Sequence, residues 1–168
     1  METVNLQLID AHQDVHLNTV RTLFESYEAS IDTDLCFQSF EEELATLPGK
    51  YAPPAGCLLL AVVSQDEKDN VAGCIALRPF EEGVCEMKRL YVDPSFRGEG
   101  VGIALVLEVI KRAQEIGYRY LWLDTLPSMV KAISLYESLG FTDIASYRYN
   151  PVPGVRYLQL DLESVSIK

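Results

Sequence analysis

The segment Val92–Gly102, VDPSFRGEGVG, decides how this chain folds. Three glycines alternate with other residues directly after Arg97. An apolar run precedes the segment, and apolar residues at helical spacing follow it. A glycine-rich loop between a strand and a helix leaves N–H groups free at the positive end of the helix dipole. The segment therefore predicts an anion-binding loop, and Arg97 adds a positive charge suited to phosphate.

The spacing of the glycines excludes two common phosphate-binding motifs. The Walker motif and the dinucleotide-binding fingerprint both require a glycine five residues after their first glycine. When the count starts at Gly98, that position holds Ile103. Taken alone, the sequence GEGVG is equally compatible with an ordinary turn, so the surrounding elements must decide between the two interpretations.

Hydrophobic periodicity around the loop predicts an α+β fold with a mixed sheet. One strand precedes the loop, a helix follows the loop, and a second strand follows the helix. In such a strand–helix–strand unit the two strands should be parallel, with a right-handed crossover. Gly117 is expected to cap the end of that helix. Strands are predicted at residues 5–11, 57–63, 71–80, 84–92, 118–124, 143–149 and 155–162, and helices at residues 20–30, 37–47, 105–116 and 127–140.

Length and composition indicate one ordinary globular domain over residues 1–168. No apolar run approaches the roughly 20 residues that a membrane helix needs. The first residues do not have the pattern of a secretory signal, so we expect a cytoplasmic location and no membrane partner. The net charge of −11 argues against nucleic acid as a partner.

The cysteines and histidines do not have the spacing of metal ligands. Neither a C-x-x-C pair nor an H-E-x-x-H motif occurs in the sequence. We therefore expect no metal, buried free thiols and histidines at the surface. The residues concerned are Cys36, Cys57, Cys74, Cys85, His12 and His16.

Two motifs together resemble those of the GNAT superfamily, the Gcn5-related N-acetyltransferases. The family motif Arg/Gln-x-x-Gly-x-Gly/Ala matches Arg97–Gly102 in full. A second family signature, a tyrosine on the next helix that is followed shortly by Gly-Phe, matches Tyr136 and Gly140–Phe141. The order of the predicted elements agrees over nearly the whole chain. At this separation the two motifs are a strong signal jointly and a modest one separately.

The resemblance implies a GNAT-like three-layer fold, with a mixed, mostly antiparallel seven-stranded sheet, about four helices and a splayed pair of parallel strands. It also implies acetyl-CoA as co-substrate in the cleft between the splayed strands, with the pyrophosphate on the N–H groups of the loop. Met129 holds a position that is often asparagine in the family, so the resemblance offers the hydroxyl of the neighbouring Ser128 as a substitute contact. The implied cofactor-binding residues are Leu90, Tyr91, Val92, Arg97, Gly98, Glu99, Gly100, Val101, Gly102 and Ser128.

The resemblance offers Glu86 and Tyr136 as catalytic residues. A glutamate base lies eleven residues before the loop arginine in the histone-acetylating branch of the family, which is the position of Glu86. Strand alternation would place Glu86 on one face with Lys88, Leu90 and Val92. A role as base and a role in an ion pair are equally supported for Glu86. Tyr136 would protonate the departing thiolate, although its stripe of apolar neighbours also fits a core residue.

The resulting hypothesis is an enzyme, an N-acetyltransferase that moves the acetyl group of acetyl-CoA directly to a primary amine of a small molecule or peptide. The alternative is a non-catalytic sensor that binds acyl-CoA in the same cleft. Tyr51, Tyr147 and Tyr149 flank loops that would line the acceptor pocket, or they are ordinary packing residues. The sequence leaves the acceptor, the acyl chain length and the oligomeric state open, a homodimer included.

A lopsided charge distribution favours a cationic acceptor. Residues 1–83 carry 15 acidic and 4 basic side chains, whereas residues 84–168 carry 10 of each. The acidic half contains the first helix pair, which walls the acceptor pocket in the family, and its field would concentrate cations there. A solvated acidic surface is a nearly equal alternative. The acidic residues in question are Asp32, Asp34, Glu41, Glu42 and Glu43.

Overall fold

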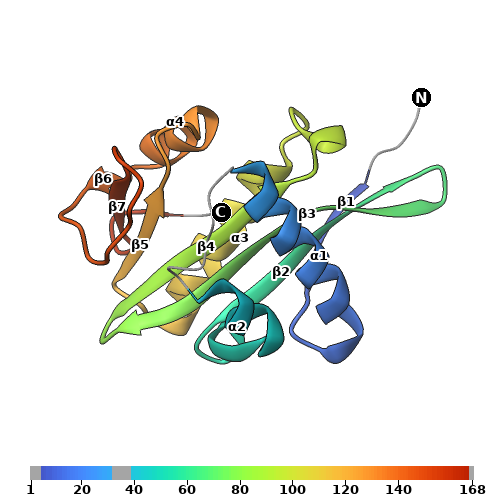
Figure 1. Cartoon of the computed structure of the whole chain (residues 1–168), viewed down its shortest axis with the longest axis horizontal. Helices are drawn as coiled ribbons and strands as arrows, with labels where there is room; N and C mark the ends of the chain where they lie inside the picture. The colour runs from blue at the N-terminus through green and yellow to red at the C-terminus, as the bar shows by residue number, and fades with distance from the viewer. Residues whose placement is uncertain (1–4, 32–38, 167–168) are drawn as a thin grey trace.

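A single mixed sheet forms the centre of the molecule, and helices cover both of its faces (Figure 1). The computed structural model describes residues 5–31 and 39–166, with the strand order β1-β2-β3-β4-β5-β7-β6. The strands are β1 (Asn5–Asp10), β2 (Cys57–Gln65), β3 (Lys68–Glu81), β4 (Val84–Val92), β5 (Tyr120–Thr125), β6 (Thr142–Asp143) and β7 (Arg156–Asp161). The α-helices are α1 (Asp14–Ser30), α2 (Phe40–Ala45), α3 (Val101–Ile116) and α4 (Val130–Ser138).

The seven strands and four α-helices of the described chain confirm the predicted fold class. β4 and β5 are parallel, as predicted, and the other neighbouring strands are antiparallel. The strand predicted at residues 143–149 is wrong, because β6 ends at Asp143. The chain leaves the sheet there since Tyr147 and Arg148 turn inward to bond the buried Glu86.

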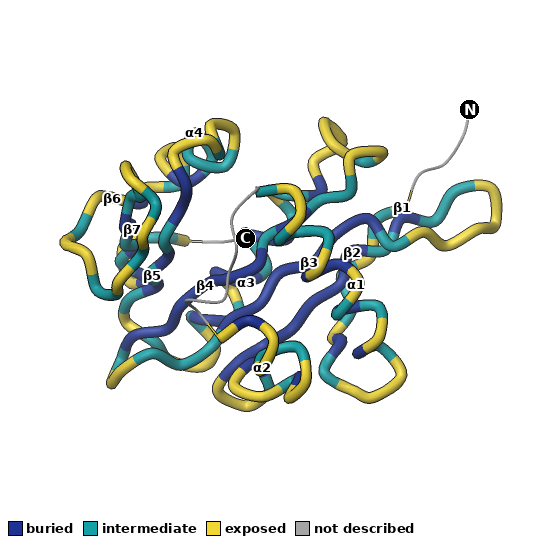
Figure 2. The backbone as a smooth tube through the Cα atoms, in the orientation of Figure 1, coloured by how far each residue is buried: buried dark blue, intermediate teal, exposed yellow. Residues whose placement is uncertain are grey.

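Side chains that alternate along the central strands divide the core into one cluster on each face of the sheet. In β2, Leu59 and Ala61 pack with α3, whereas Leu58 and Leu60 pack with α1 and α2 on the opposite face. In Figure 1, α3 accordingly lies behind the sheet and α1 and α2 lie in front of it. Figure 2 shows that the central strands are buried over most of their length. The sheet and the helices on its two faces form the three expected layers.

The helix after the glycine loop forms as its apolar spacing predicts. Leu105, Val109 and Ala113 recur at helical intervals and are fully buried against the sheet. Gly117 ends α3 in the left-handed conformation, with φ of 107°, and its N–H bonds to the carbonyls of Ala113 and Gln114. This confirms Gly117 as the C-terminal cap.

The described cysteines are free and buried, which confirms the prediction for Cys57, Cys74 and Cys85. Cys36 lies outside the described residues. Among residues 5–31 and 39–166, no helix is long and apolar enough to cross a membrane.

β4 and β5 separate after three paired residues. Val84–Glu86 pairs with Tyr120–Trp122, and beyond these residues the two described strands are not paired to each other. The pairing of β4 with β3 is interrupted near Arg89, whose φ of 63° marks a β-bulge. A bulge inserts one residue and bends the strand, which directs the end of β4 away from β5.

The bulge corrects the expected alternation along β4. The prediction that Leu90 and Val92 share a face with Glu86 is wrong, because both pack with Met87 in the cluster beneath α3. The extra residue at Arg89 shifts the pleat by one position, and such a shift turns every following side chain to the opposite face.

A buried ion pair holds the bulge in place. The Arg89 side chain is 3% exposed, and its Nε lies 2.9 Å from Oε2 of Glu43. Its Nη2 donates a second hydrogen bond to Oε1 of Glu43 at 3.1 Å, and the guanidinium lies 5.1 Å from the centre of the Phe40 ring. The paired hydrogen bonds fix the geometry of both groups, so α2 is tied to β4 at the point where the strand bends.

Candidate active site

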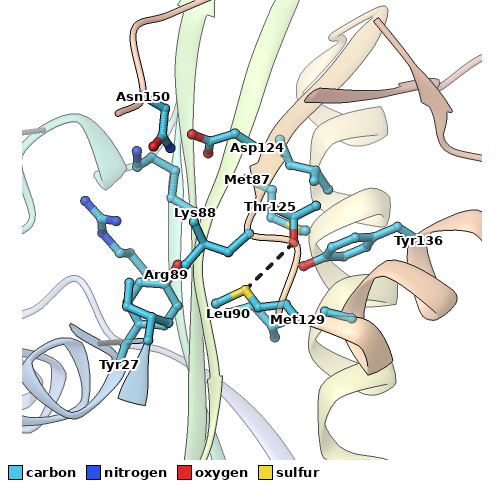
Figure 3. A pocket seen from close by; sticks show the side chains of 14 residues that line it. Tyr27, Met87, Lys88, Arg89, Leu90, Asp124, Thr125, Met129, Tyr136 and Asn150 are labelled. Atoms are coloured by element: carbon cyan, nitrogen blue, oxygen red, sulfur yellow. Dashed lines mark hydrogen bonds between the residues drawn. The ribbon is translucent and has the colours of Figure 1, made fainter. Parts of the chain in front are cut away.

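A pocket opens between the separated ends of β4 and β5 (Figure 3). Its walls are Met87–Leu90 of β4, Leu123–Thr125 of β5 with the following Leu126, Met129 just before α4, Ala132 and Tyr136 on α4, the end of α1, and Asn150. Because the two strands are not paired here, the edge of β4 can offer its backbone groups to a ligand, as an open sheet edge does for a peptide.

The lining of the pocket includes residues from the clusters on both faces of the sheet. Tyr136 on one side belongs to the cluster beneath α3, and Tyr27 on the other side packs with the cluster beneath α1. Asp124 alternates along β5 with the buried Leu123, which belongs to the α3 cluster, so Asp124 faces the α1 side. Two ligands could therefore meet in this opening from opposite faces of the sheet.

Tyr136 lies where its family position predicts, with its hydroxyl pointing into the pocket (Figure 3). Its ring is buried and packs on Phe141, with 5.5 Å between the ring centres. Burial raises the pKa of Tyr136, so the hydroxyl keeps its proton at neutral pH and can donate it. The core and the site interpretations of this residue are therefore compatible.

The glycine loop follows β4 directly and is open to a ligand. Gly98 and Gly100 have φ of 82° and 83°, the left-handed region that favours glycine. A Cβ atom on Gly98 would meet no atom within 4 Å, and one on Gly100 would meet only Ile103, at 3.9 Å. No side chain caps the start of α3, so its first N–H groups remain available. The loop thus fits the pyrophosphate predicted for it.

The other predicted cofactor contacts lie in different surroundings. Arg97 folds back so that its Nε donates to the Val92 carbonyl at 3.0 Å, and its guanidinium lies 5.9 Å from the centre of the Tyr91 ring. The Tyr91 side chain packs in the α1 cluster, so only its backbone is available to a ligand at this edge. Ser128 is exposed outside the pocket wall, whereas Met129 lines it.

Glu86 lies in a buried network beside the pocket. Its side chain is 0% exposed. Arg78 and Arg148 each place a guanidinium nitrogen near Oε1, at 2.8 Å and 2.7 Å, and the Tyr147 hydroxyl donates to Oε2 at 2.7 Å. Both carboxylate oxygens are therefore already bonded within the protein.

The network keeps Glu86 ionised. Burial alone would raise the pKa of this carboxyl, but the charges of Lys88, Arg148 and Arg78 and the hydrogen bond from Tyr147 together hold its pKa below the ordinary value. A catalytic base works best when its pKa lies near the operating pH. The ion-pair interpretation therefore fits the geometry of Glu86 better than the base interpretation.

Two charged residues in the pocket wall, Asp124 and Arg89, were not predicted from the sequence, and Lys88 was considered only as a partner of Glu86. Burial and the charge of Arg89 lower the pKa of Lys88 to about 7. Both basic residues interrupt the apolar strand CEMKRLYV, and Asp124 follows the apolar LWL. Charged side chains are rarely buried unless they are paired or functional. The positions of these three residues in or beside apolar strand segments could therefore have indicated a functional site.

The predicted acceptor-pocket residues are dispersed. Tyr51 lines a second pocket and donates to Glu43, and Tyr149 is 77% exposed. Of the acidic residues, Glu41 and Glu42 are exposed on α2. Glu43 instead turns inward to Arg89. Asp32 and Asp34 lie outside the described residues.

The Glu86 network should contribute stability that depends on pH. Since the folded-state pKa of Glu86 is lowered, the contribution is present above about pH 5 and is lost as the pH falls below 4.5. Glu86→Gln should lower the free energy of unfolding by about 3–5 kcal/mol at neutral pH, because two arginines lose their buried partner. Urea unfolding between about pH 3 and 7 measures both the pH dependence and the loss of stability in the variant.

Glu137→Gln is the matched control, since Glu137 pairs with Arg156 at 2.8 Å with its side chain 55% exposed. An exposed pair contributes about 1 kcal/mol or less. Equal losses in the two variants, with the same pH dependence as the wild type, would contradict the buried-network interpretation.

Comparison with known proteins agrees with this arrangement. A family model described as Acetyltransferase (GNAT) family matches residues 17–141. An uncharacterized N-acetyltransferase of Schizosaccharomyces pombe is 39% identical over 160 residues, which are 95% of each chain. A GNAT-family acetyltransferase of Staphylococcus aureus has a TM-score of 0.76 at 19% identity, over 94% of this chain and 99% of that one. The structure of yncA from Salmonella typhimurium with its cofactor acetyl-CoA has a TM-score of 0.62 at 19% identity, over 94% of both chains. The chain therefore belongs to the GNAT family of acetyltransferases.

Proposed function

We propose that this protein transfers the acetyl group of acetyl-CoA directly to a primary amine of a small molecule or peptide. The observation that carries the proposal is the pocket between β4 and β5, which is lined by residues from both faces of the sheet. The glycine loop and the uncapped start of α3 follow β4 directly. A solved relative of the same fold, yncA, holds acetyl-CoA as its cofactor, which supports the same co-substrate here.

The α3 side of the sheet is the proposed entrance for acetyl-CoA. Its pyrophosphate would accept hydrogen bonds from the loop N–H groups between Gly98 and Gly102, where the helix dipole favours negative charge. Its pantetheine arm would bond to the unpaired edge of β4 at Leu90–Val92. The thioester would then lie between Leu90 and Tyr136, which both line the pocket.

The chemistry requires a polarised carbonyl, an unprotonated amine and a proton for the leaving thiolate. A backbone N–H near Leu90 is suited to polarise the carbonyl oxygen as an oxyanion donor. The hydroxyl of Tyr136 carries a proton at neutral pH and points into the pocket, so it is suited to protonate the sulfur. Glu86 supports the site as the centre of an ion-pair network, because its oxygens are bonded to Arg78, Arg148 and Tyr147.

Gly100→Ala should weaken binding of coenzyme A about tenfold or more, because a methyl group would stand where the pyrophosphate approaches the backbone. Gly83→Ala is the matched control. Gly83 also has a left-handed φ, 77°, and open space around its Cβ position, but it lies in the turn between β3 and β4. Isothermal titration calorimetry measures the dissociation constants.

Both substitutions should lower stability by a similar amount, roughly 1–2 kcal/mol, since each forces alanine into the left-handed region. The comparison of the two variants therefore separates the effect of backbone strain from the effect of a methyl group in contact with the ligand. If folded Gly100→Ala binds coenzyme A as tightly as Gly83→Ala does, the pyrophosphate is not on this loop.

Tyr136→Phe should lower kcat about 10²-fold, because the ring remains while the proton donor is lost. The dissociation constant for acetyl-CoA should stay near that of the wild type. Tyr149→Phe, an exposed position outside the pocket, serves as control. Single-turnover kinetics isolates the chemical step, and an unchanged single-turnover rate in Tyr136→Phe would remove the acid role from this residue.

A further inference from the structure

Asp124 is the penultimate residue of β5 and forms part of the pocket wall. Its Oδ2 atom is buried, and within the described chain no group donates a hydrogen bond to it. Buried polar atoms are almost always hydrogen-bonded, and an unpartnered one costs about 1–3 kcal/mol, more when it is charged. A carboxylate oxygen left in this state at the wall of a pocket indicates that a ligand supplies its donor.

The charged and titratable groups around Asp124 come from α1, β4, α4 and the segment that precedes β7. Two of them are engaged elsewhere, because Arg148 bonds to Glu86 at 2.7 Å and Tyr147 donates to the same carboxylate. Glu86 therefore accepts the hydrogen bonds of two groups whose charges still act on Asp124. The groups that interact with Asp124 through their charge are Tyr27, Lys88, Tyr136, Tyr147 and Arg148.

We infer that Asp124 binds the ammonium group of an aliphatic primary amine and accepts its proton, an assignment that rests on the proposed acetyl transfer. Asp124 faces the α1 side of the sheet, whereas Tyr136 belongs to the α3 side. An amine that enters from the α1 side thus reaches Asp124 with the thioester beyond it. An ammonium group supplies the N–H donors that Oδ2 lacks, in a charge-assisted hydrogen bond.

The proton balance of this step is complete without a further reactant. An aliphatic amine is protonated in neutral water and cannot attack a thioester until it loses a proton. One proton moves from R–NH3+ to the Asp124 carboxylate, and the freed nitrogen lone pair bonds to the thioester carbon as the C–S bond breaks. The sulfur takes a proton from the Tyr136 hydroxyl, which regains one from the new amide nitrogen. The proton on Asp124 then passes to solvent.

The test is Asp124→Asn, which keeps the size of the side chain and removes its charge. Asp161→Asn on β7, outside the pocket, is the control. Release of the coenzyme A thiol is measured with benzylamine, putrescine and lysine as aliphatic amines, and with aniline, which is unprotonated at neutral pH. Calorimetry measures acetyl-CoA binding separately, and urea unfolding measures stability.

For Asp124→Asn, kcat/KM toward the aliphatic amines should fall about 10²-fold at neutral pH, and the loss should shrink as the pH rises and the amine deprotonates in solution. The rate with aniline should change little. The variant should be as stable as the wild type or more stable, because a buried carboxylate oxygen that accepts no hydrogen bond within the described chain is replaced by an uncharged group. Acetyl-CoA should bind both variants as it binds the wild type.

Three results would overturn the inference while the proposed function stands. They are an unchanged kcat/KM of Asp124→Asn toward aliphatic amines, a loss of equal size with aniline and at every pH, and turnover of aniline alone by the wild type. A wild-type protein that binds acetyl-CoA but acetylates none of these amines would instead overturn the proposed function.

Discussion

The separation of β4 from β5 is the constraint on which the rest of the molecule depends. Three paired residues join the strands at one end, and the bulge at Arg89 bends β4 away beyond them. Two buried ion-pair networks hold this geometry, one from Glu43 to Arg89 and one around Glu86, which connects β3 to the segment before β7. Such networks add little net stability relative to an apolar core but are costly to break, so we interpret them as fixing the strands in position.

The opening divides the chemistry between the two faces of the sheet. On the α3 side are the glycine loop, the uncapped helix start and the protonated Tyr136 hydroxyl, which suit an anionic cofactor and a departing thiolate. On the α1 side is Asp124, whose buried oxygen lacks a donor within the described chain. The bulge affects both sides of the sheet. It turns the side chains at the end of β4 toward the α3 cluster, while Lys88 and Asp124 remain in the pocket wall.

The parts of this arrangement that depend on nearby residues could be predicted from the sequence. Most elements, the parallel strand pair and the glycine loop followed from local spacing, and Tyr136 followed from a family motif. The bulge could not be predicted, because it depends on the ion pair of Arg89 with Glu43, 46 positions away in the chain. The strand predicted after β6 was wrong for the same kind of reason, since Tyr147 bonds to a residue 61 positions away. The missing hydrogen bond at Oδ2 of Asp124 likewise depends on distant residues, since Tyr147 and Arg148 bond to Glu86 instead.

The central claim is that acetyl-CoA binds between β4 and β5. A crystal structure with acetyl-CoA tests it most directly, because it shows where the cofactor lies. We expect the pyrophosphate to accept hydrogen bonds from the N–H groups of Gly98–Gly102 and the thioester to lie between Leu90 and Tyr136, in the opening between β4 and β5. Coenzyme A bound outside this opening, or a pyrophosphate away from the glycine loop, would contradict it.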